Sequence, residues 1–275
     1  MKKNILITGV AGFIGSNLAE MLLKNNFNVV GIDNLSYGVL EQVPKGVDFH
    51  KKDIRDKDIN KFFNDIDCVF HLAAKNSIID CEENPSETED INVNGTKNIF
   101  EASIRKNIRK VIYAESSAVY EGTKKFPSSE TDANPQSVYA KSKIATNFIA
   151  RDFLKSHGLI STGLRYFNVY GPKQDYRRTI PPVFSAFIIK LLQKKSPTIY
   201  GDGSKKRDRL HIGFLAQEAL EVEKANGYGS SNDDSLVVNL TEDGMSYGMK
   251  YERLVPILVN AIKELSAKVT ALEAG

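Results

Sequence analysis

The chain has 275 residues, 41 % hydrophobic and 26 % charged, with a formal net charge of +3 at pH 7. This balance suits one large α/β domain, or a domain of about 200 residues with a smaller module. Mixed charges do not indicate a nucleic-acid or membrane partner, and no apolar run approaches the roughly 20 residues that span a bilayer. Two cysteines without metal-ligand spacing and four scattered histidines predict no metal site and a reducing cytoplasm.

The first stretch of the chain predicts a phosphate site. Ile5–Ile7 form an apolar run typical of a strand buried on both faces of a parallel sheet, and residues 16–24 suit an amphipathic helix. Between them lie Gly9, Gly12 and Gly15. Glycines allow a tight turn and let the backbone approach a pyrophosphate, while the helix N-terminus presents free N–H groups to its charge.

An acidic residue then points to the kind of nucleotide. Asp33 follows a second apolar run, residues 28–32, about 20 residues beyond the last glycine. Its carboxylate can accept hydrogen bonds from a ribose and repels a 2′-phosphate, which favours NAD over NADP. An ordinary turn remains the alternative for a glycine cluster taken alone.

Short apolar runs continue to alternate with helical stretches. Further strands are expected at residues 47–50, 68–72, 110–114 and 160–166, and helices at residues 57–63, 85–106, 136–157 and 181–192. This alternation predicts a Rossmann-type α/β fold with a doubly wound parallel sheet. Right-handed crossovers bring the carboxyl ends of the strands to one edge, where ligands bind. Residues that follow these strand ends are Asp33, Asp53, Ala73, Ser116 and Asn168.

The second long helix carries a candidate proton-transfer pair. Tyr139 and Lys143 are four positions apart in the sequence, which places both on one helical face. An ammonium near a phenol favours the phenolate, which can remove a hydroxyl proton while hydride leaves the same carbon. Ser116 can hydrogen-bond the same oxygen. The alternative is a solvated helix face without a chemical role.

These motifs together resemble the extended short-chain dehydrogenase/reductase family and, within it, the NAD-dependent nucleotide-sugar epimerases and dehydratases. The resemblance covers residues 1 to about 208. The motifs are Thr-Gly-x-x-Gly-x-x-Gly at 8–15, Asp33-Asn34, His71-Leu-Ala-Ala74, Asn92-Val-Asn-Gly-Thr96, Tyr139-x-x-x-Lys143, Arg165-Tyr-Phe-Asn-Val-Tyr-Gly-Pro172 and Arg207-Asp208.

The resemblance implies NAD as cofactor and a UDP-sugar as substrate. Asp53 and Ile54 would then flank the adenine, and Leu72 to Ala74 would line the nicotinamide ribose, with Asn92 behind them. The implied cofactor-binding residues are Gly9, Gly12, Phe13, Ile14, Gly15, Asp33, Asn34, Asp53, Ile54, Leu72, Ala73, Ala74, Asn92, Tyr139, Lys143 and Tyr166. The implied catalytic residues are Ser116, Tyr139 and Lys143, and the implied substrate-binding residues are Ser117, Asn168 and Arg207.

The segment Glu115-Ser-Ser-Ala-Val-Tyr120 narrows the family. Dehydratases of the group carry an Asp-Glu pair where this chain has Ser117 and Ala118, and the related decarboxylases use a glutamate there. The segment resembles 4-epimerases of UDP-glucose or UDP-N-acetylglucosamine, which implies transient oxidation to a 4-keto sugar. Glu115 departs from the usual small residue. Another nucleotide-sugar oxidoreductase or dehydratase remains an alternative.

After residue 208 the chain departs from the family pattern. Residues 213–218 and a heptad-spaced end resemble the C-terminal intramolecular chaperone of phage tail fibres and endosialidases, and predict a helix with coiled-coil character. The expected domains are 1–170, NAD-binding; 171–208, a truncated substrate lobe; and 209–275, the chaperone-like module. Alternatively, the terminal helix packs on its own domain, and residues 236–241 could form the next strand of the sheet. The heptad residues are Val255, Leu258, Ile262, Leu265, Val269 and Leu272.

Two kinds of homo-oligomer follow from these readings. The resemblance to epimerases implies a dimer that pairs through the two long helices, residues 85–106 and 136–157. The terminal helix instead leaves the number of copies open, because the chaperone family that it resembles is trimeric while its heptad residues favour two strands. A non-catalytic, NAD-binding assembly protein is therefore the rival to a cytoplasmic epimerase.

Overall fold

The computed structural model describes residues 2–108, 110–125, 128–175, 181–198, 210–211, 238–240 and 247–249. They belong to two units. The first comprises Met1–Phe167 and Gly171–Thr198, and the second comprises Asn168–Tyr170 and Ile199–Gly275.

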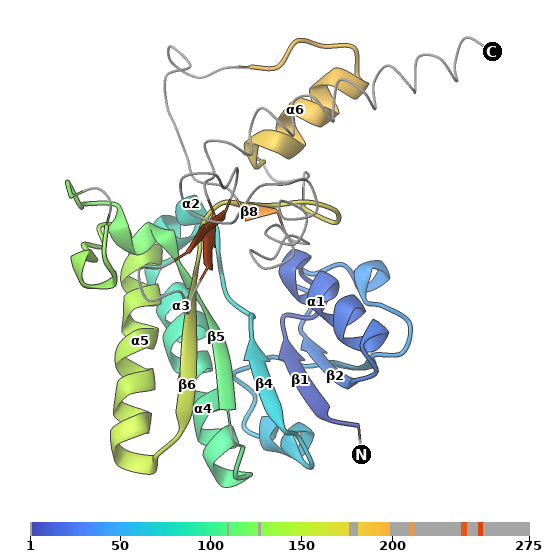
Figure 1. The fold of residues 1–275 in the computed structure, drawn as a ribbon, viewed down its shortest axis with the longest axis vertical. Helices are drawn as coiled ribbons and strands as arrows, with labels where there is room; N and C mark the ends of the chain where they lie inside the picture. Colours follow the sequence, from blue (N-terminus) through green and yellow to red (C-terminus); the bar gives the residue numbers. More distant parts are fainter. Residues whose placement is uncertain are drawn as a thin grey trace. The chain divides into compact units, whose positions relative to one another are not determined.

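The first unit is built on a six-stranded parallel sheet with the order β3-β2-β1-β4-β5-β6 (Figure 1). The order reverses between β1 and β4, so the expected doubly wound, Rossmann-type fold is confirmed. The strands are β1 (Asn4–Thr8), β2 (Asn28–Asp33), β3 (Asp48–Lys51), β4 (Cys68–His71), β5 (Lys110–Ser116) and β6 (Ile160–Tyr166).

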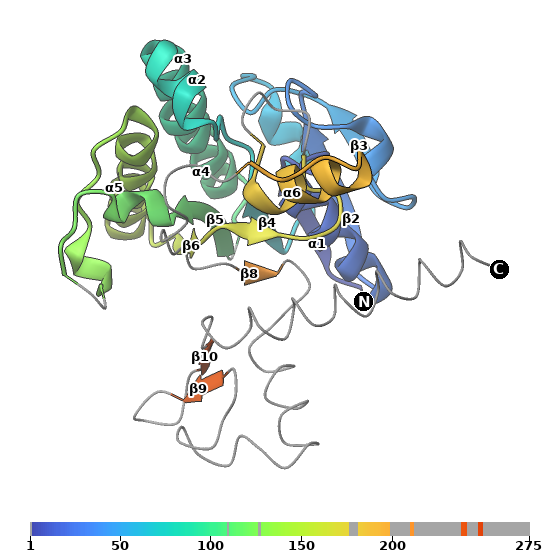
Figure 2. The same cartoon turned by 90° about the horizontal axis from the view of Figure 1, so that it is seen from above.

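Helices cover both faces of this sheet. In Figures 1 and 2, α4 and α5 lie over one face and α1 lies over the other. The helices are α1 (Phe13–Lys24), α2 (Ile78–Glu83), α3 (Pro85–Glu89), α4 (Gly95–Arg105), α5 (Val138–His157) and α6 (Val183–Leu192). Single turns are η1 (Leu40–Gln42), η2 (Ile59–Phe63), η3 (Asp90–Asn94), η4 (Ser117–Tyr120) and η5 (Glu130–Asp132).

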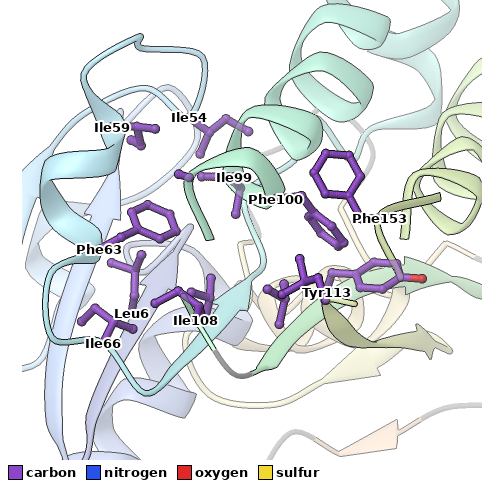
Figure 3. Close-up of a cluster of buried hydrophobic side chains, with 14 of the residues drawn as sticks. Leu6, Ile54, Ile59, Phe63, Ile66, Ile99, Phe100, Ile108, Tyr113 and Phe153 are labelled. Carbon is purple, nitrogen blue, oxygen red and sulfur yellow. The ribbon is translucent and has the colours of Figure 1, made fainter. Parts of the chain in front are cut away.

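Two hydrophobic clusters explain why the strands are apolar without alternation. Leu6 of β1 points into one cluster, which also holds Phe100 of α4 and Phe153 of α5 (Figure 3). Its neighbours Ile5 and Ile7 point into the second cluster, under α1. Because successive side chains alternate between two buried faces, every position of the strand must be apolar.

Three sequence expectations differ from the observed elements. The helix expected at residues 57–63 is the 3₁₀ turn η2, and the helix expected at residues 85–106 contains the π-helical turn η3 between α3 and α4. Residues 238–240 form β9, which pairs antiparallel with β10 (Tyr247–Met249) and is not part of the six-stranded sheet. The expected terminal helix lies outside the described residues.

The second unit contains two strand pairs in its described part. One is the β9–β10 pair, and the other joins β7 (Val169–Tyr170) to β8 (Leu210–His211) in parallel. Within the described part of the chain, none of the helices is both long enough and apolar enough to cross a membrane.

The larger core cluster predicts a stability effect at Phe100, whose side chain is fully buried. Phe100→Ala should lower the free energy of unfolding by about 3–5 kcal/mol, because it removes buried area and leaves a cavity. Urea denaturation measures this loss. Leu40→Ala, at a half-exposed position, is the control and should change stability by less than about 0.5 kcal/mol. Equal losses in the two variants would contradict the assigned core.

Candidate active site

The glycine turn brings the backbones of β1, α1 and the loop after β4 into direct contact. Gly9 has φ = +76°, and a Cβ added there would lie 2.7 Å from the backbone nitrogen of Ala73. A Cβ on Gly15 would overlap the carbonyl oxygen of Gly9. Side chains are therefore excluded at both positions, for conformational reasons at Gly9 and for lack of space at both.

This turn fits the pyrophosphate of a dinucleotide. Gly12 is the N-cap of α1 and brings no capping side chain, and the first turn, which starts with Phe13 and Ile14, has no acidic residue. The N–H groups at the start of α1 are thus presented to a bound anion, whose charge the helix dipole also favours.

Asp33 fastens this turn to the end of β2. Its Oδ2 accepts a hydrogen bond from Ala11 N at 3.0 Å, and its Oδ1 accepts one from Leu35 N at 2.8 Å. Burial raises the pKa of Asp33, while these two backbone hydrogen bonds oppose the shift. Each carboxylate oxygen has a second lone pair, so Asp33 can hold the turn and still accept from ribose hydroxyls.

Asp53 and Asn34 lie together beyond β3 and β2. Asn34 Nδ2 donates to Asp53 Oδ2 at 2.9 Å. Arg55 donates to both oxygens of Asp53, at 2.9 and 2.8 Å, and this contact lowers the pKa of the carboxyl. The neighbouring Ile54 is buried. Its side chain packs against Gly95 so closely that a Cβ on Gly95 would clash with it. The carboxylate of Asp53 is thus held ionised at the edge where the adenine is expected.

His71 is a neutral, fully hydrogen-bonded histidine. Thr96 Oγ1 donates to Asn92 O at 2.6 Å, so it must accept from His71 Nε2–H, 2.9 Å away. His71 Nδ1 then accepts from Thr8 Oγ1 at 2.7 Å, and that hydroxyl accepts from Ala73 N at 3.3 Å. Burial, with a contribution from the nearby Lys143 charge, lowers the pKa of His71 to about 3. His71 therefore holds the ends of β1 and β4 together.

Asn92 connects the loop after β4 to α5. Its Oδ1 accepts from Lys75 N at 2.8 Å, and its Nδ2 donates to Lys75 O at 3.0 Å and to Ser142 Oγ at 2.9 Å. Ser142 Oγ in turn donates to Tyr139 O at 2.7 Å. The π-helical turn that contains Asn92 is a common feature of functional sites.

The ammonium of Lys75 is buried and pairs with Glu87 of α3. Burial disfavours this charge, yet the pairing raises the pKa of Lys75 overall. Lys75 is not among the site residues predicted from the sequence. Its position directly after His71-Leu-Ala-Ala74 is the signal that could have found it.

Tyr139 and Lys143 occupy the first turns of α5, next to the end of β5. Ser137 Oγ accepts from Ala140 N at 3.1 Å and so fixes where the helix begins. Lys143 Nζ lies 5.9 Å from the centroid of the Tyr139 ring and donates to Ala114 O at 3.1 Å. Burial lowers the pKa of Lys143 to about 8. The amine is therefore mostly protonated at neutral pH.

Ser116 ends β5 beside this pair of residues. Its Oγ accepts from Ala118 N at 3.2 Å and thus caps the turn η4. The hydroxyl hydrogen of Ser116 is still a donor, so the cap is compatible with the expected bond to a substrate oxygen. Tyr166 is the neighbour of Ser116 on β6, and burial raises its pKa.

The other expected site residues have different positions. Leu72, Ala73 and Ala74 follow β4 and are half-buried, and Ser117 opens η4. Asn168 belongs to the second unit, and Arg207 lies outside the described residues. No group of His, Cys, Asp and Glu within the described ranges could hold a metal ion.

Comparisons with known proteins bear on the family and the fold. Residues 5–222 match the model of the NAD dependent epimerase/dehydratase family, beyond the break expected near residue 208. A putative UDP-glucose 4-epimerase of Methanocaldococcus jannaschii is 39 % identical over 78 % of this chain and 72 % of its own length. The resemblance of the C-terminal part to a phage chaperone stays a prediction.

Two solved structures are similar over most of the chain. The UDP-N-acetylglucosamine 4-epimerase of Methanobrevibacter ruminantium M1, in complex with UDP-N-acetylmuramic acid, has a TM-score of 0.77 and 33 % identity, covering 96 % of this chain and 83 % of its own. The UDP-glucose 4-epimerase of Thermus thermophilus, in complex with NAD, has a TM-score of 0.70 and 29 % identity, covering 92 % of this chain and 81 % of its own.

The neutral state of His71 predicts a pH effect on stability. The pKa of His71 in the folded protein, about 3, lies below the ordinary 6.5. At a pH between these two values, the unfolded chain binds a proton at this residue and the folded protein does not. Stability from this group is present above pH 6.5 and falls by up to about 1.4 kcal/mol per pH unit on acidification. Urea unfolding from pH 7 to about 4 should show a steeper loss for the wild type than for His71→Gln. Parallel curves would contradict the assignment.

Proposed function

The chain belongs to the NAD dependent epimerase/dehydratase family, and we propose that it inverts a UDP-sugar at C4 through a transient 4-keto sugar. One observation carries this proposal. Tyr139 and Lys143 share a helical face beside Ser116, at the edge of the sheet that also carries the glycine turn. The cofactor is NAD, and the fit of the turn to a pyrophosphate is consistent with it.

When bound, NAD supplies the reversible hydride acceptor that oxidation at C4 requires. The phenolic oxygen of Tyr139 removes the proton of the 4-hydroxyl group as that carbon is oxidised, and later returns it. Lys143, as an ammonium, favours the phenolate of Tyr139. Ser116 donates to the oxygen at C4. The 4-keto sugar would then turn within the site, and Tyr139 would return the proton to the oxygen at C4, which becomes the hydroxyl group of the 4-epimer.

The turn after β5 supports the proposed type of reaction, and the relatives support the substrate class. Ser117 and Ala118 provide no carboxyl group for the elimination of water, which argues for epimerisation over dehydration. The relatives named for UDP-glucose and UDP-N-acetylglucosamine support the same substrate class. Asn168 and Arg207 are the residues that we propose to bind the diphosphate of this substrate.

The proposal is tested with purified protein, UDP-glucose and UDP-N-acetylglucosamine. We expect 4-epimer formation from at least one sugar, read by chromatography or NMR, and NAD released on denaturation. Bound NAD without epimerisation of either sugar would favour the rival, a non-catalytic assembly protein.

Tyr139→Phe should lower turnover by about 10²–10⁴-fold, because it removes the group that transfers the proton. The variant should still contain NAD, since the glycine turn and Asp33 are unchanged. Steady-state kinetics and NAD content together measure the effect. Tyr113→Phe, which changes a tyrosine in the core cluster, is the matched control and should stay within about 3-fold of the wild type. Wild-type turnover in Tyr139→Phe would exclude the proposed base.

We also propose that two copies pair through the outer face of α5. Phe148 on this helix is 62 % exposed, which is unusual for so large an apolar side chain outside an interface. Sedimentation should give a dimer for the wild type and a smaller species for Phe148→Glu, because a buried charge would oppose association. A trimer that Phe148→Glu leaves intact would instead favour the terminal helix as the contact.

A further inference from the structure

The carboxylate of Glu115 lies on the face of β5 that packs against the core, where an apolar side chain is expected. Val111, Tyr113 and Glu115 point to the same side, and all three are buried, with Glu115 only 3 % exposed. An ionised group there is costly unless it is paired and hydrogen-bonded. Glu115 therefore needs partners that are held in place by the fold.

Three neighbouring side chains satisfy this carboxylate. Arg165 Nε of β6 donates to Oε2 at 2.7 Å, while Asn147 Nδ2 of α5 and the Tyr113 hydroxyl donate to Oε1 at 2.8 and 3.0 Å. Gly163 leaves the space for them, since a Cβ there would lie 2.5 Å from Glu115 Oε1. The side chains of Glu115 and Arg165 are 2 % and 15 % exposed, so this ion pair is largely withdrawn from water.

Arg165 extends the contact to the turn that follows Ser116. Its Nη1 donates to the Tyr120 hydroxyl and to Glu130 O, the latter at 2.8 Å. Its guanidinium carbon also lies 5.2 Å from the centroid of the Tyr120 ring, which stacks with Phe167 at 6.3 Å. The ion pair thus connects β5 and α5, which carry the candidate proton-transfer groups, to β6 and η4.

We propose that the Glu115–Arg165 ion pair is a positioning unit that holds Ser116 and Lys143 in register for proton transfer. Glu115 lies between Ala114, whose carbonyl accepts from Lys143, and Ser116. Asn147, which Glu115 binds, is one helical turn beyond Lys143 on α5. The inference rests on the proposed epimerase function, and neither residue of the pair touches the sugar in this role.

The charges around Lys143 add an electrostatic consequence. The groups that face it are Cys81 of α2, neutral His71 of β4, Glu115 of β5 and Tyr139 of α5 itself. Burial lowers the pKa of Lys143, and Cys81 and Glu115 oppose that shift. Loss of the Glu115 charge should therefore lower this pKa further.

The test compares Glu115→Gln, the double variant Glu115→Gln/Arg165→Met, and Tyr113→Phe. Glu115→Gln keeps the shape but leaves Arg165 unpaired, and kcat should fall by up to about 100-fold with little change in KM, as expected for misplaced groups. The alkaline limb of the kcat profile should move to lower pH. Tyr113→Phe removes one hydrogen bond to the same carboxylate but keeps its charge, so the pH profile should stay in place.

The double variant separates positioning from stability. Replacement of a buried ion pair by neutral side chains often leaves stability unchanged, so its Tm should return toward the wild-type value while kcat stays low. A kcat that recovers with Tm, or a pH profile that Glu115→Gln leaves unchanged, would overturn the inference.

A second measurement does not depend on sugar turnover. The pH dependence of NADH binding, followed by its fluorescence, should report the titration of Lys143, and its midpoint should fall in Glu115→Gln. If the wild type binds NADH but epimerises no UDP-sugar, the proposed function fails, while this midpoint still decides whether Glu115 acts on Lys143.

Discussion

The structure depends on a contact between two backbones. Gly9 approaches Ala73 so closely that a single Cβ would not fit, and Gly15 approaches the carbonyl of Gly9 in the same way. These contacts bring the end of β1, the start of α1 and the loop after β4 to one point. The proposed pyrophosphate site is consequently made of main chain, and the side chain of Asp33 joins it to β2. Backbone N–H groups held in this way need no rearrangement when an anion binds.

Around this point, buried polar groups join the strand ends to the helices. The hydrogen-bonded chain from Thr8 through His71 to Thr96 crosses from β1 to α4, and Asn92 continues it to Ser142 on α5. Among the described residues, every buried side-chain nitrogen and oxygen has a hydrogen-bond partner. A fully satisfied network of this kind specifies one arrangement, because each lost bond leaves an unpaired group in a medium of low dielectric constant. The position of Tyr139 thus depends on Asn92 and Ser142, which hold its backbone through hydrogen bonds.

Buried charged side chains also have partners. Lys75 pairs with Glu87, and Arg165 pairs with Glu115, whereas Lys143 faces a carbonyl oxygen. Buried ion pairs contribute little net stability, since desolvation offsets much of their attraction. Their value here is geometric, because each pair joins elements whose relative position matters at the edge of the sheet.

The sequence alone was enough to predict the six strands, α1 and α5, the glycine turn, and the spacing of Tyr139 and Lys143. All of these are signals between near neighbours in the chain: apolar runs, helical spacing, and glycines between a strand and a helix. The folded structure was needed to establish the tautomer of His71, the π-helical turn at Asn92, the pairing of β9 with β10, and the pairing of Glu115 with Arg165. Each of these depends on which atoms meet after folding, and residues such as Glu115 and Arg165 are brought together by the register of β5 and β6, which no local pattern contains.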